Sequence, residues 1–133
     1  MLSPGESAFR YQSGIFRSKS DVVSACRDIE ALVGSAFAVP LHDLRAPGRG
    51  RAAAAFARQV AMYLAHVELG LTLSIVAMHF GRDRTTVAHA CGRVEDRRDD
   101  PVIDMTLFCL TSVIAQHYRE FGAVAAECRG RVL

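Results

Sequence analysis

The sequence lacks any pair of cysteines at metal-binding spacing. Its cysteines are widely separated and none belongs to a CxxC pair, so a zinc finger or zinc ribbon is excluded. In such a setting cysteine behaves as a small buried hydrophobe, and that is the interpretation of Cys26, Cys91 and Cys109. We therefore expect no metal site and no cofactor.

Targeting and membrane segments are also missing. The N-terminal residues MLSPGESAFRYQ contain neither the basic region nor the apolar region of a signal peptide. The longest apolar stretch, near residues 102–115, contains Asp104 and is too short to span a bilayer. A reduced cytoplasm is the expected location, with no membrane partner.

The residues needed for catalysis are scarce as well. No GxxxxGK[ST] phosphate-binding loop occurs, and the sequence contains a single lysine, Lys19. Asp83 and His89 are six positions apart, too far round a helix to form an acid–base dyad, and no nucleophile lies near a plausible base. The sequence predicts neither an enzyme nor a small-molecule substrate.

What the sequence does contain is enough apolar material for one domain of 133 residues, with 50% hydrophobic and 23% charged residues. The net charge of +2 is too small to identify a partner. Its distribution is more informative, because no acidic residue occurs between Leu44 and Glu68. This basic segment indicates either a nucleic-acid contact or a solvated face, and it contains Arg45, Arg49, Arg51 and Arg58.

Helical patterns follow one another along the chain, and no strand pattern competes with them. Residues 1–19 are rich in serine and glycine and are interpreted as a mobile arm. Ser20 is the predicted N-cap of a helix from Asp21 to about Phe37, with an apolar stripe at positions 22, 26, 29 and 33. Pro40 ends it, residues 41–44 form at most one further turn, and residues 45–51 form a basic loop. The alanine-rich segment 52–66 predicts the next helix, with Arg58 and Gln59 off its apolar side.

A two-helix motif occupies residues 71–98. Gly81, Arg82 and Asp83 break the first helix, and apolar residues at positions 87, 90, 91 and 94 recur with helical spacing on the second. Short hydrogen-bonding side chains are left on the outer side of this second helix, near its N-terminus. That arrangement suits insertion into the major groove of DNA, and the outer residues are Arg84, Thr85, Thr86, His89 and Arg93.

The last helix begins with Asp100 as N-cap and Pro101 in its first turn, and is predicted to run to about Glu127, with Gly130 beyond its end. Its apolar residues follow a heptad-like seam: Ile103, Leu107, Leu110, Ile114, His117, Phe121 and Val124. The seam favours packing inside the molecule, with His117 as a core histidine. Because Met105, Phe108 and Val113 widen the apolar surface, a homodimer through residues 101–127 is the alternative.

Two separated segments together resemble a known family. ARQVAMYLAH at residues 57–66 and LTLSIVAMHFGRDRTTVAHAC at residues 71–91 resemble, in order and spacing, the C-terminal DNA-binding domain (domain IV) of the bacterial replication initiator DnaA. The resemblance spans roughly residues 22–96. It implies an all-α helical bundle whose helix-turn-helix is like those of DnaA and the Trp repressor, with a long C-terminal helix added. The expected division is an arm (1–19), the DNA-binding domain (20–100) and the C-terminal helix (101–133).

The resemblance also implies roles for individual residues. Arg58 and Gln59 stand at the family's Arg-Gln pair, which holds DNA phosphates. The segment from Asp83 to Thr86 matches the RDHTT signature that contacts base edges and a phosphate. The implied base contacts are Asp83, Arg84, Thr85, Thr86 and His89, and the implied backbone or minor-groove contacts are Arg49, Arg51, Arg58, Gln59 and Arg93.

Several positions depart from the family pattern. Arg84 replaces the signature's histidine and would favour guanine; Gly81 stands where two glycines are usual, which shortens the turn by a residue; Ala57 replaces a proline. Neither Arg49 nor Arg51 lies at the family's usual spacing from Arg58, and either of them could be the minor-groove arginine. With no phosphate-binding loop, the prediction is a stand-alone DnaA-like protein in the cytoplasm, associated with the nucleoid. It would regulate transcription or replication at DnaA-box-like sites without ATPase activity. The alternative function is a protein-interaction module that has lost specific DNA binding.

Overall fold

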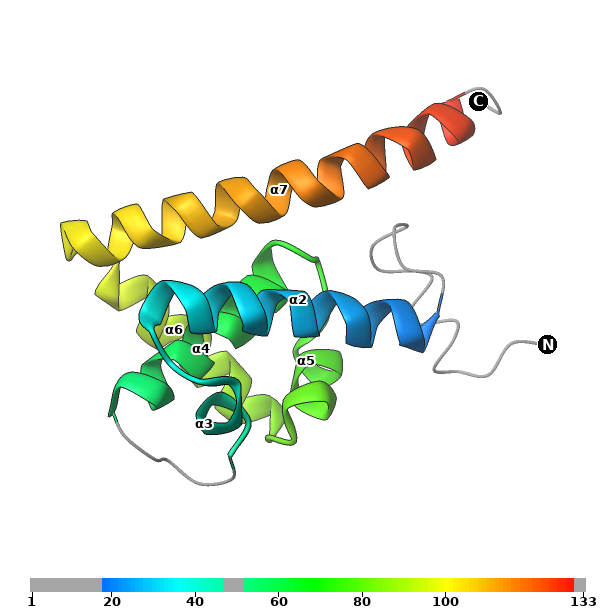
Figure 1. Ribbon diagram of the computed structural model, residues 1–133. Coiled ribbons are helices and arrows are strands. Elements are labelled where there is room, and N and C mark those ends of the chain that lie inside the picture. Colours follow the sequence, from blue (N-terminus) through cyan, green and yellow to red (C-terminus); the bar gives the residue numbers. More distant parts are fainter. Residues whose placement is uncertain (1–17, 47–51, 131–133) are drawn as a thin grey trace.

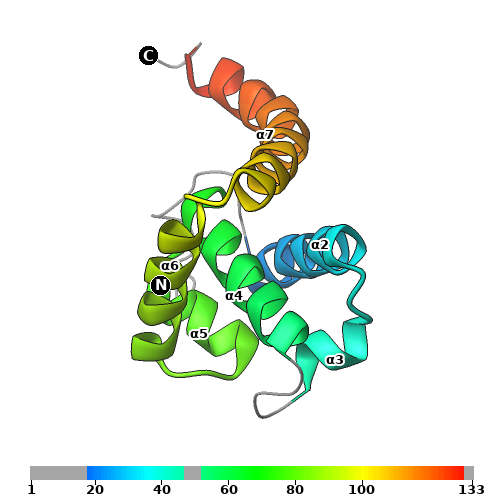
Figure 2. The same cartoon turned by 90° about the vertical axis from the view of Figure 1, so that its left-hand side faces the viewer.

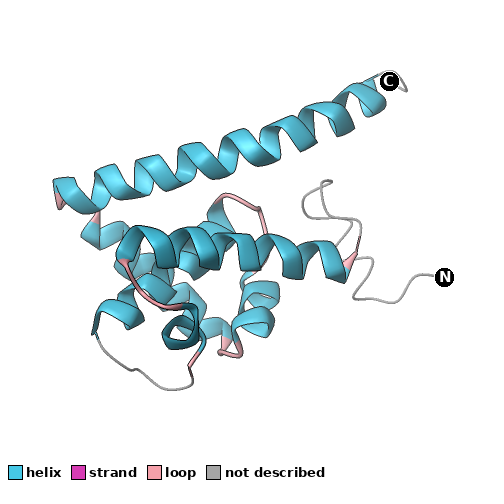
Figure 3. Cartoon of the chain, viewed as in Figure 1, coloured by secondary structure: helices cyan, strands magenta, loops and turns pink. Residues whose placement is uncertain are grey.

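The described part of the chain in the computed structural model, residues 18–46 and 52–130 with side chains as far as Tyr118, is helical (Figures 1 and 3). No strand occurs in these ranges, which confirms the all-α prediction. No helix within them is long and apolar enough to cross a membrane. The helices are α2 (Lys19–Phe37), α3 (Leu41–Arg45), α4 (Ala52–Val67), α5 (Leu73–Phe80), α6 (Arg84–Arg97) and α7 (Pro101–Gly130).

Helix α4 lies at the centre of the fold and packs against α2, α3, α5 and α6 (Figure 2). Its middle is buried on all sides because alanines alternate with larger apolar residues, and alanine lets a neighbouring helix approach closely. Four of its core positions are alanine: Ala54, Ala57, Ala61 and Ala65. The alanine-rich stretch that predicts this helix therefore also explains its central position.

The start of α2 differs slightly from the prediction. Ser18 is the N-cap: its Oγ accepts a hydrogen bond from the backbone N–H of Asp21 at 3.2 Å, whereas Ser20 is an exposed residue inside the first turn. The remainder of the predicted arm, residues 1–17, lies outside the described residues. The predicted stripe is confirmed, since Val22, Cys26, Ile29 and Val33 are all buried.

Helix α2 ends in a tight reversal that leads into α3. Ala38 adopts a left-handed conformation at φ 54°, and its N–H bonds the carbonyls of Gly34 and Ser35. Gly34 is required here because a Cβ at this position would lie 2.8 Å from the carbonyl oxygen of Val39. The reversal places the short helix α3 beside both α2 and α4.

Helix α7 begins as predicted, because the Asp100 carboxylate accepts a hydrogen bond from the N–H of Val102 at 2.9 Å. The helix continues to Gly130, three residues beyond the predicted end. Leu107, Leu110 and Ile114 are buried against the core of the same chain. The intramolecular interpretation of the seam is thus confirmed as far as Ile114.

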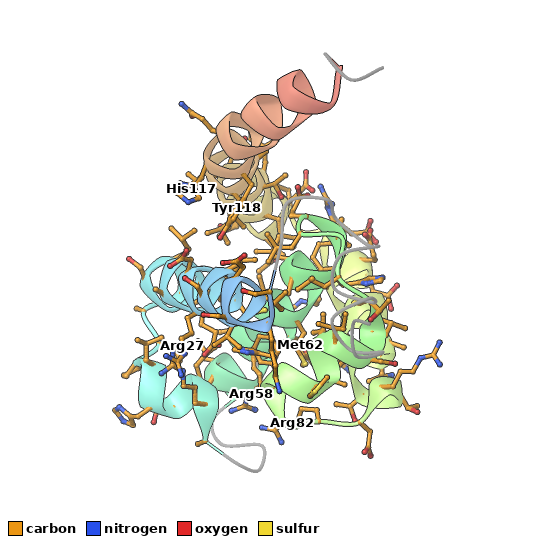
Figure 4. All side chains as sticks on the ribbon, turned by 90° about the vertical axis from the view of Figure 1, so that its right-hand side faces the viewer. Arg27, Arg58, Met62, Arg82, His117 and Tyr118 are labelled. Atoms are coloured by element: carbon orange, nitrogen blue, oxygen red, sulfur yellow. The ribbon has the colours of Figure 1, made fainter. Side chains whose placement is uncertain are left out.

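Two predictions about α7 are wrong, and a third concerns side chains outside the described residues. His117 is exposed rather than in the core; the next residue, Tyr118, is turned toward α2 and its hydroxyl donates to Asp28 at 3.3 Å (Figure 4). Cys109 is exposed rather than buried, because it faces away from the buried Leu110. The side chains of Phe121 and Val124 lie outside the described residues.

Candidate nucleic-acid interface

Local chemistry fixes the two-helix motif at its turn. Thr72 caps α5 by accepting the N–H of Ile75 at 3.2 Å. Gly81 ends the same helix in the left-handed region, at φ 62°, which glycine adopts at little cost. The backbone N–H of Arg82 then bonds the carbonyl of Ala77 at 3.0 Å. One glycine is therefore sufficient to close this turn.

Helix α6 has one buried and one exposed side. Val87, Ala90 and Val94 are buried against the core, which confirms three of the four predicted positions; Cys91 is half-buried. The candidate DNA-contacting residues all lie on the exposed side: Asp83, Arg84, Thr85, Thr86, His89 and Arg93. Because residues four apart share a helix face, Thr85, His89 and Arg93 follow one another along the outer surface.

Asp83 stands at the N-cap of α6 but does not cap it with its side chain. Its backbone carbonyl accepts the N–H of Val87 at 3.1 Å, while the carboxylate makes no capping hydrogen bond. The carboxylate is exposed beside the positive end of the helix dipole. It can therefore accept a hydrogen bond from a ligand at this end of α6.

Contacts at the C-terminal end of α6 hold that end of the helix against α4. The Tyr63 hydroxyl donates to the Glu95 carboxylate at 2.5 Å and accepts from the Arg98 guanidinium at 3.1 Å. Burial and the adjacent Glu95 raise the pKa of Tyr63, so its hydroxyl remains a donor. The Arg97 guanidinium lies over the Phe56 ring, 4.5 Å from its centroid.

The predicted phosphate-binding residues lie in different surroundings. Arg58 is 5% exposed, and its guanidinium donates to the carbonyls of Leu44 at 2.8 Å and Asp43 at 2.9 Å. Arg58, which is predicted to lie off the apolar side of α4, is therefore inside the protein and not on its surface. Gln59 is half-buried, and Arg49 and Arg51 lie outside the described residues.

A polar cluster around the buried Glu30, formed with Arg45 and His79, was missed by sequence reasoning. The Glu30 carboxylate accepts from the Arg45 Nε and pairs with the His79 Nε2, both at 2.6 Å. Helical spacing carried a signal for it, because Glu30 follows Cys26 by four residues and so falls on the buried side of α2. Nothing in the sequence pairs Glu30 with a histidine 49 positions away.

Metal binding gains no support from the side chains that are described. They contain no group of three or more histidine, cysteine or acidic residues able to hold an ion. The Cys26 thiol is buried, and burial, with the nearby Glu30, raises its pKa to about 12. It therefore stays protonated and packs as an apolar residue.

Comparison with known proteins gives a consistent family match. The family described as "Bacterial dnaA protein helix-turn-helix" matches residues 26–94. The chromosomal replication initiator protein DnaA of Bifidobacterium animalis subsp. lactis is 38% identical over 82 residues, 61% of this chain and 14% of that protein. Its counterpart in Acinetobacter baumannii strain AYE is 40% identical over 79 residues, 58% of this chain and 17% of that protein. The chain therefore spans less than a fifth of the length of these relatives.

Proposed function

The chain belongs to the bacterial DnaA helix-turn-helix family, and from this premise we propose that it binds double-stranded DNA sequence-specifically by inserting α6 into the major groove. The observation that carries the proposal is the two-sided character of α6. Its buried residues fix the helix to the core, whereas the polar side chains of its first three turns are exposed together. A helix presented in this way can enter a major groove N-terminus first.

Each exposed side chain near the start of α6 suits a base edge. The Arg84 guanidinium can donate twice to the O6 and N7 of guanine, and the Asp83 carboxylate can accept from the N4 of cytosine. The methyl groups of Thr85 and Thr86 suit the C5-methyl of thymine, and His89 lies one turn further along the same face as Thr85. A short site containing at least one G·C pair is the expected target.

Backbone contacts would come from the basic residues around the motif. Arg93 is exposed on α6 one turn beyond His89, where it can reach a phosphate at the groove edge. Arg49 and Arg51 follow α3 in the chain, and Gln59 lies on α4 beside Arg58. With three arginine–phosphate contacts, from Arg49, Arg51 and Arg93, at about 0.9 each, the log–log salt slope is expected to be about −3.

The cellular role we propose is regulation of replication initiation or of transcription at DnaA-box-like sites. The matched relatives are named chromosomal replication initiators, which supports a place at sites of that kind. Arg84 occupies the signature position expected to contact a base, so the site read by this chain is expected to carry guanine there.

Arg84→Ala tests base reading directly. Selection of bound duplexes from a random pool should return one enriched motif for the unchanged protein, and Arg84→Ala should lower affinity for it about 10- to 100-fold, equivalent to about 1–3 kcal/mol. Repeating the selection with the variant should show one relaxed position. Fluorescence anisotropy with the selected duplex measures the affinities.

Arg93→Ala is the matched control, since it removes an exposed arginine from the same helix. It should weaken all duplexes about equally and reduce the salt slope by about 1. If the random pool yields no enriched sequence with the unchanged protein, specific readout is wrong. If Arg84→Ala weakens every duplex alike, Arg84 contacts only the backbone.

A second candidate function, association of two copies through α7, is favoured by the apolar face that this helix turns away from the core. We propose it on the exposure of Val102 (72%), Met105 (62%), Phe108 (64%) and Val113 (50%).

Phe108→Glu tests this association. Sedimentation velocity at micromolar concentration should show a dimer for the unchanged protein and a monomer for the variant, because a charge at the centre of an apolar interface costs several kcal/mol. Val67→Glu is the matched control, since Val67 is 48% exposed and lies on α4, away from this face. A monomeric unchanged protein across the whole concentration range would contradict the proposal.

A further inference from the structure

The exit of α3, residues 43–46, is held by side chains from three other parts of the chain. Arg58 of α4 donates to the carbonyls of Asp43 and Leu44, and Arg82 of the α5–α6 turn donates to the carbonyl of Ala46 at 3.0 Å. Arg45 itself donates to Glu30 of α2, whose second carboxylate oxygen is 2.6 Å from His79 of α5. Figure 4 shows Arg58 and Arg82 at the same end of the molecule.

These contacts connect the exit of α3 to the start of α6. His79 lies in the last turn of α5, and Arg82 is followed directly by Asp83, the N-cap of α6. Glu30 binds one residue of the α3 exit and one residue of α5 with the two oxygens of a single carboxylate. Because Glu30 lies within the long helix α2, it holds Arg45 and His79 in fixed positions relative to each other.

Stability alone does not account for a charge at this position. The Glu30 side chain is 3% exposed, and desolvating a carboxylate costs several kcal/mol, which a salt bridge does little more than offset. An apolar residue of similar volume would fill the same space without that cost. Helix α3 has five residues and no side-chain N-cap, so its own hydrogen bonds cannot fix its orientation.

We propose that Glu30 is a positioning residue for DNA binding: it fixes the exit of α3 against the α5–α6 turn, so that the basic α3 exit and α6 meet the duplex in one register. The inference rests on the proposed DNA binding and adds a residue on α2 that touches no DNA. Contacts on both sides of a turn contribute fully only when their spacing is held to a fraction of an ångström. Glu30 supplies that restraint through Arg45 and His79.

The sign of the effect of Glu30→Gln tests the proposal. Removing a negative charge from a DNA-binding domain should, by electrostatics alone, strengthen binding to every duplex. Positioning predicts the opposite for the specific site: a loss of about 10-fold in affinity for the selected duplex, with affinity for a scrambled duplex unchanged or slightly higher. Both affinities are measured by anisotropy at a temperature where circular dichroism shows that the variant is folded.

Arg45→Lys is the second variant and does not depend on the folding of Glu30→Gln. Arg45 is 47% exposed, so lysine is accommodated; it keeps the positive charge but loses the Nε donor that binds Glu30. Positioning predicts a loss of several-fold confined to the specific duplex, whereas a simple phosphate contact predicts no change. Asp99→Asn, which neutralises an exposed acid outside the cluster, is the control and should weaken neither duplex.

The outcomes separate the two proposals. If the unchanged protein shows no preference between the selected and scrambled duplexes, the proposed function is wrong, and this inference with it. If the unchanged protein discriminates and both variants keep the full ratio of specific to non-specific affinity, DNA binding stands and the positioning role of Glu30 is wrong. A fall in that ratio for either variant, with Asp99→Asn unchanged, supports the role.

Discussion

Arg58→Ala is expected to destabilise the fold by about 3 kcal/mol, because a buried guanidinium that satisfies backbone carbonyls is removed. The carbonyls of Asp43 and Leu44 would lose their donor inside the protein, and the 5%-exposed side chain would leave a space between α3 and α4. Burial and the nearby Arg82 lower the pKa of the Arg58 guanidinium, so the bonds it makes to these carbonyls offset a real desolvation cost.

Urea unfolding followed by circular dichroism measures this loss. Arg84→Ala is the matched control, since it removes an exposed arginine and should change the free energy of unfolding by less than about 0.5 kcal/mol. We expect Arg58 to influence DNA binding mainly by holding α3. A variant that unfolds at the same urea concentration as the unchanged protein, yet binds all duplexes more weakly, would instead assign Arg58 to a phosphate.

Local patterns were sufficient to predict the helix-turn-helix. Gly81, the stripe at Val87, Ala90 and Val94, and the polar residues between them each act within a few positions, so sequence spacing determines on which side of α6 they lie. The outer face of α6 could therefore be predicted without any knowledge of α2 or α7. The same holds for the cap at Asp100, which needs only the N–H of Val102.

The surroundings of Arg58 and Glu30 could not be predicted in this way. A single apolar stripe was assumed for α4, but this helix is enclosed by four others, so even the row containing Ala54, Arg58 and Ala61 is buried. A charged residue in such a row is tolerated only when groups distant in the sequence satisfy its hydrogen bonds or balance its charge. Those groups, the α3 carbonyls for Arg58 and His79 for Glu30, are brought near by tertiary packing and leave no mark in local spacing.

His117 illustrates a smaller limit of the same kind. The seam predicts this position inside the fold, whereas the contact with the core is made by the partly buried Tyr118, whose hydroxyl donates to Asp28 of α2. Eleven residues make almost three full turns of an α-helix, so Tyr118 lies on the same side of α7 as Leu107, whereas His117 falls about 80° away. The seam is accurate at Leu107 and Ile114 and has shifted by residue 118.

Glu30→Gln is also expected to remove much of the acid sensitivity of the fold. Burial alone would raise the pKa of the Glu30 carboxyl, but hydrogen bonds from His79 and Arg45 outweigh it and hold that pKa below its ordinary value of 4.5. A group with a lowered folded-state pKa stabilises the protein above its unfolded-state pKa, and this contribution disappears as the pH falls through the folded-state value. The unchanged protein should therefore lose stability as the pH falls from about 5 toward 3.

The variant separates this carboxyl from all other acids of the chain. At neutral pH, Glu30→Gln should be less stable by about 2 kcal/mol, less than a fully buried pair would cost because Arg45 can turn to solvent. Its free energy of unfolding should then change less between pH 5 and 3, so the two curves converge in acid. Urea titrations at several pH values measure both curves, and Asp96→Asn, an exposed acid on α6, should follow the unchanged protein throughout. If the two curves stay parallel between pH 5 and 3, other groups cause the acid sensitivity. The Glu30 carboxyl would then have the same pKa in the folded and unfolded states.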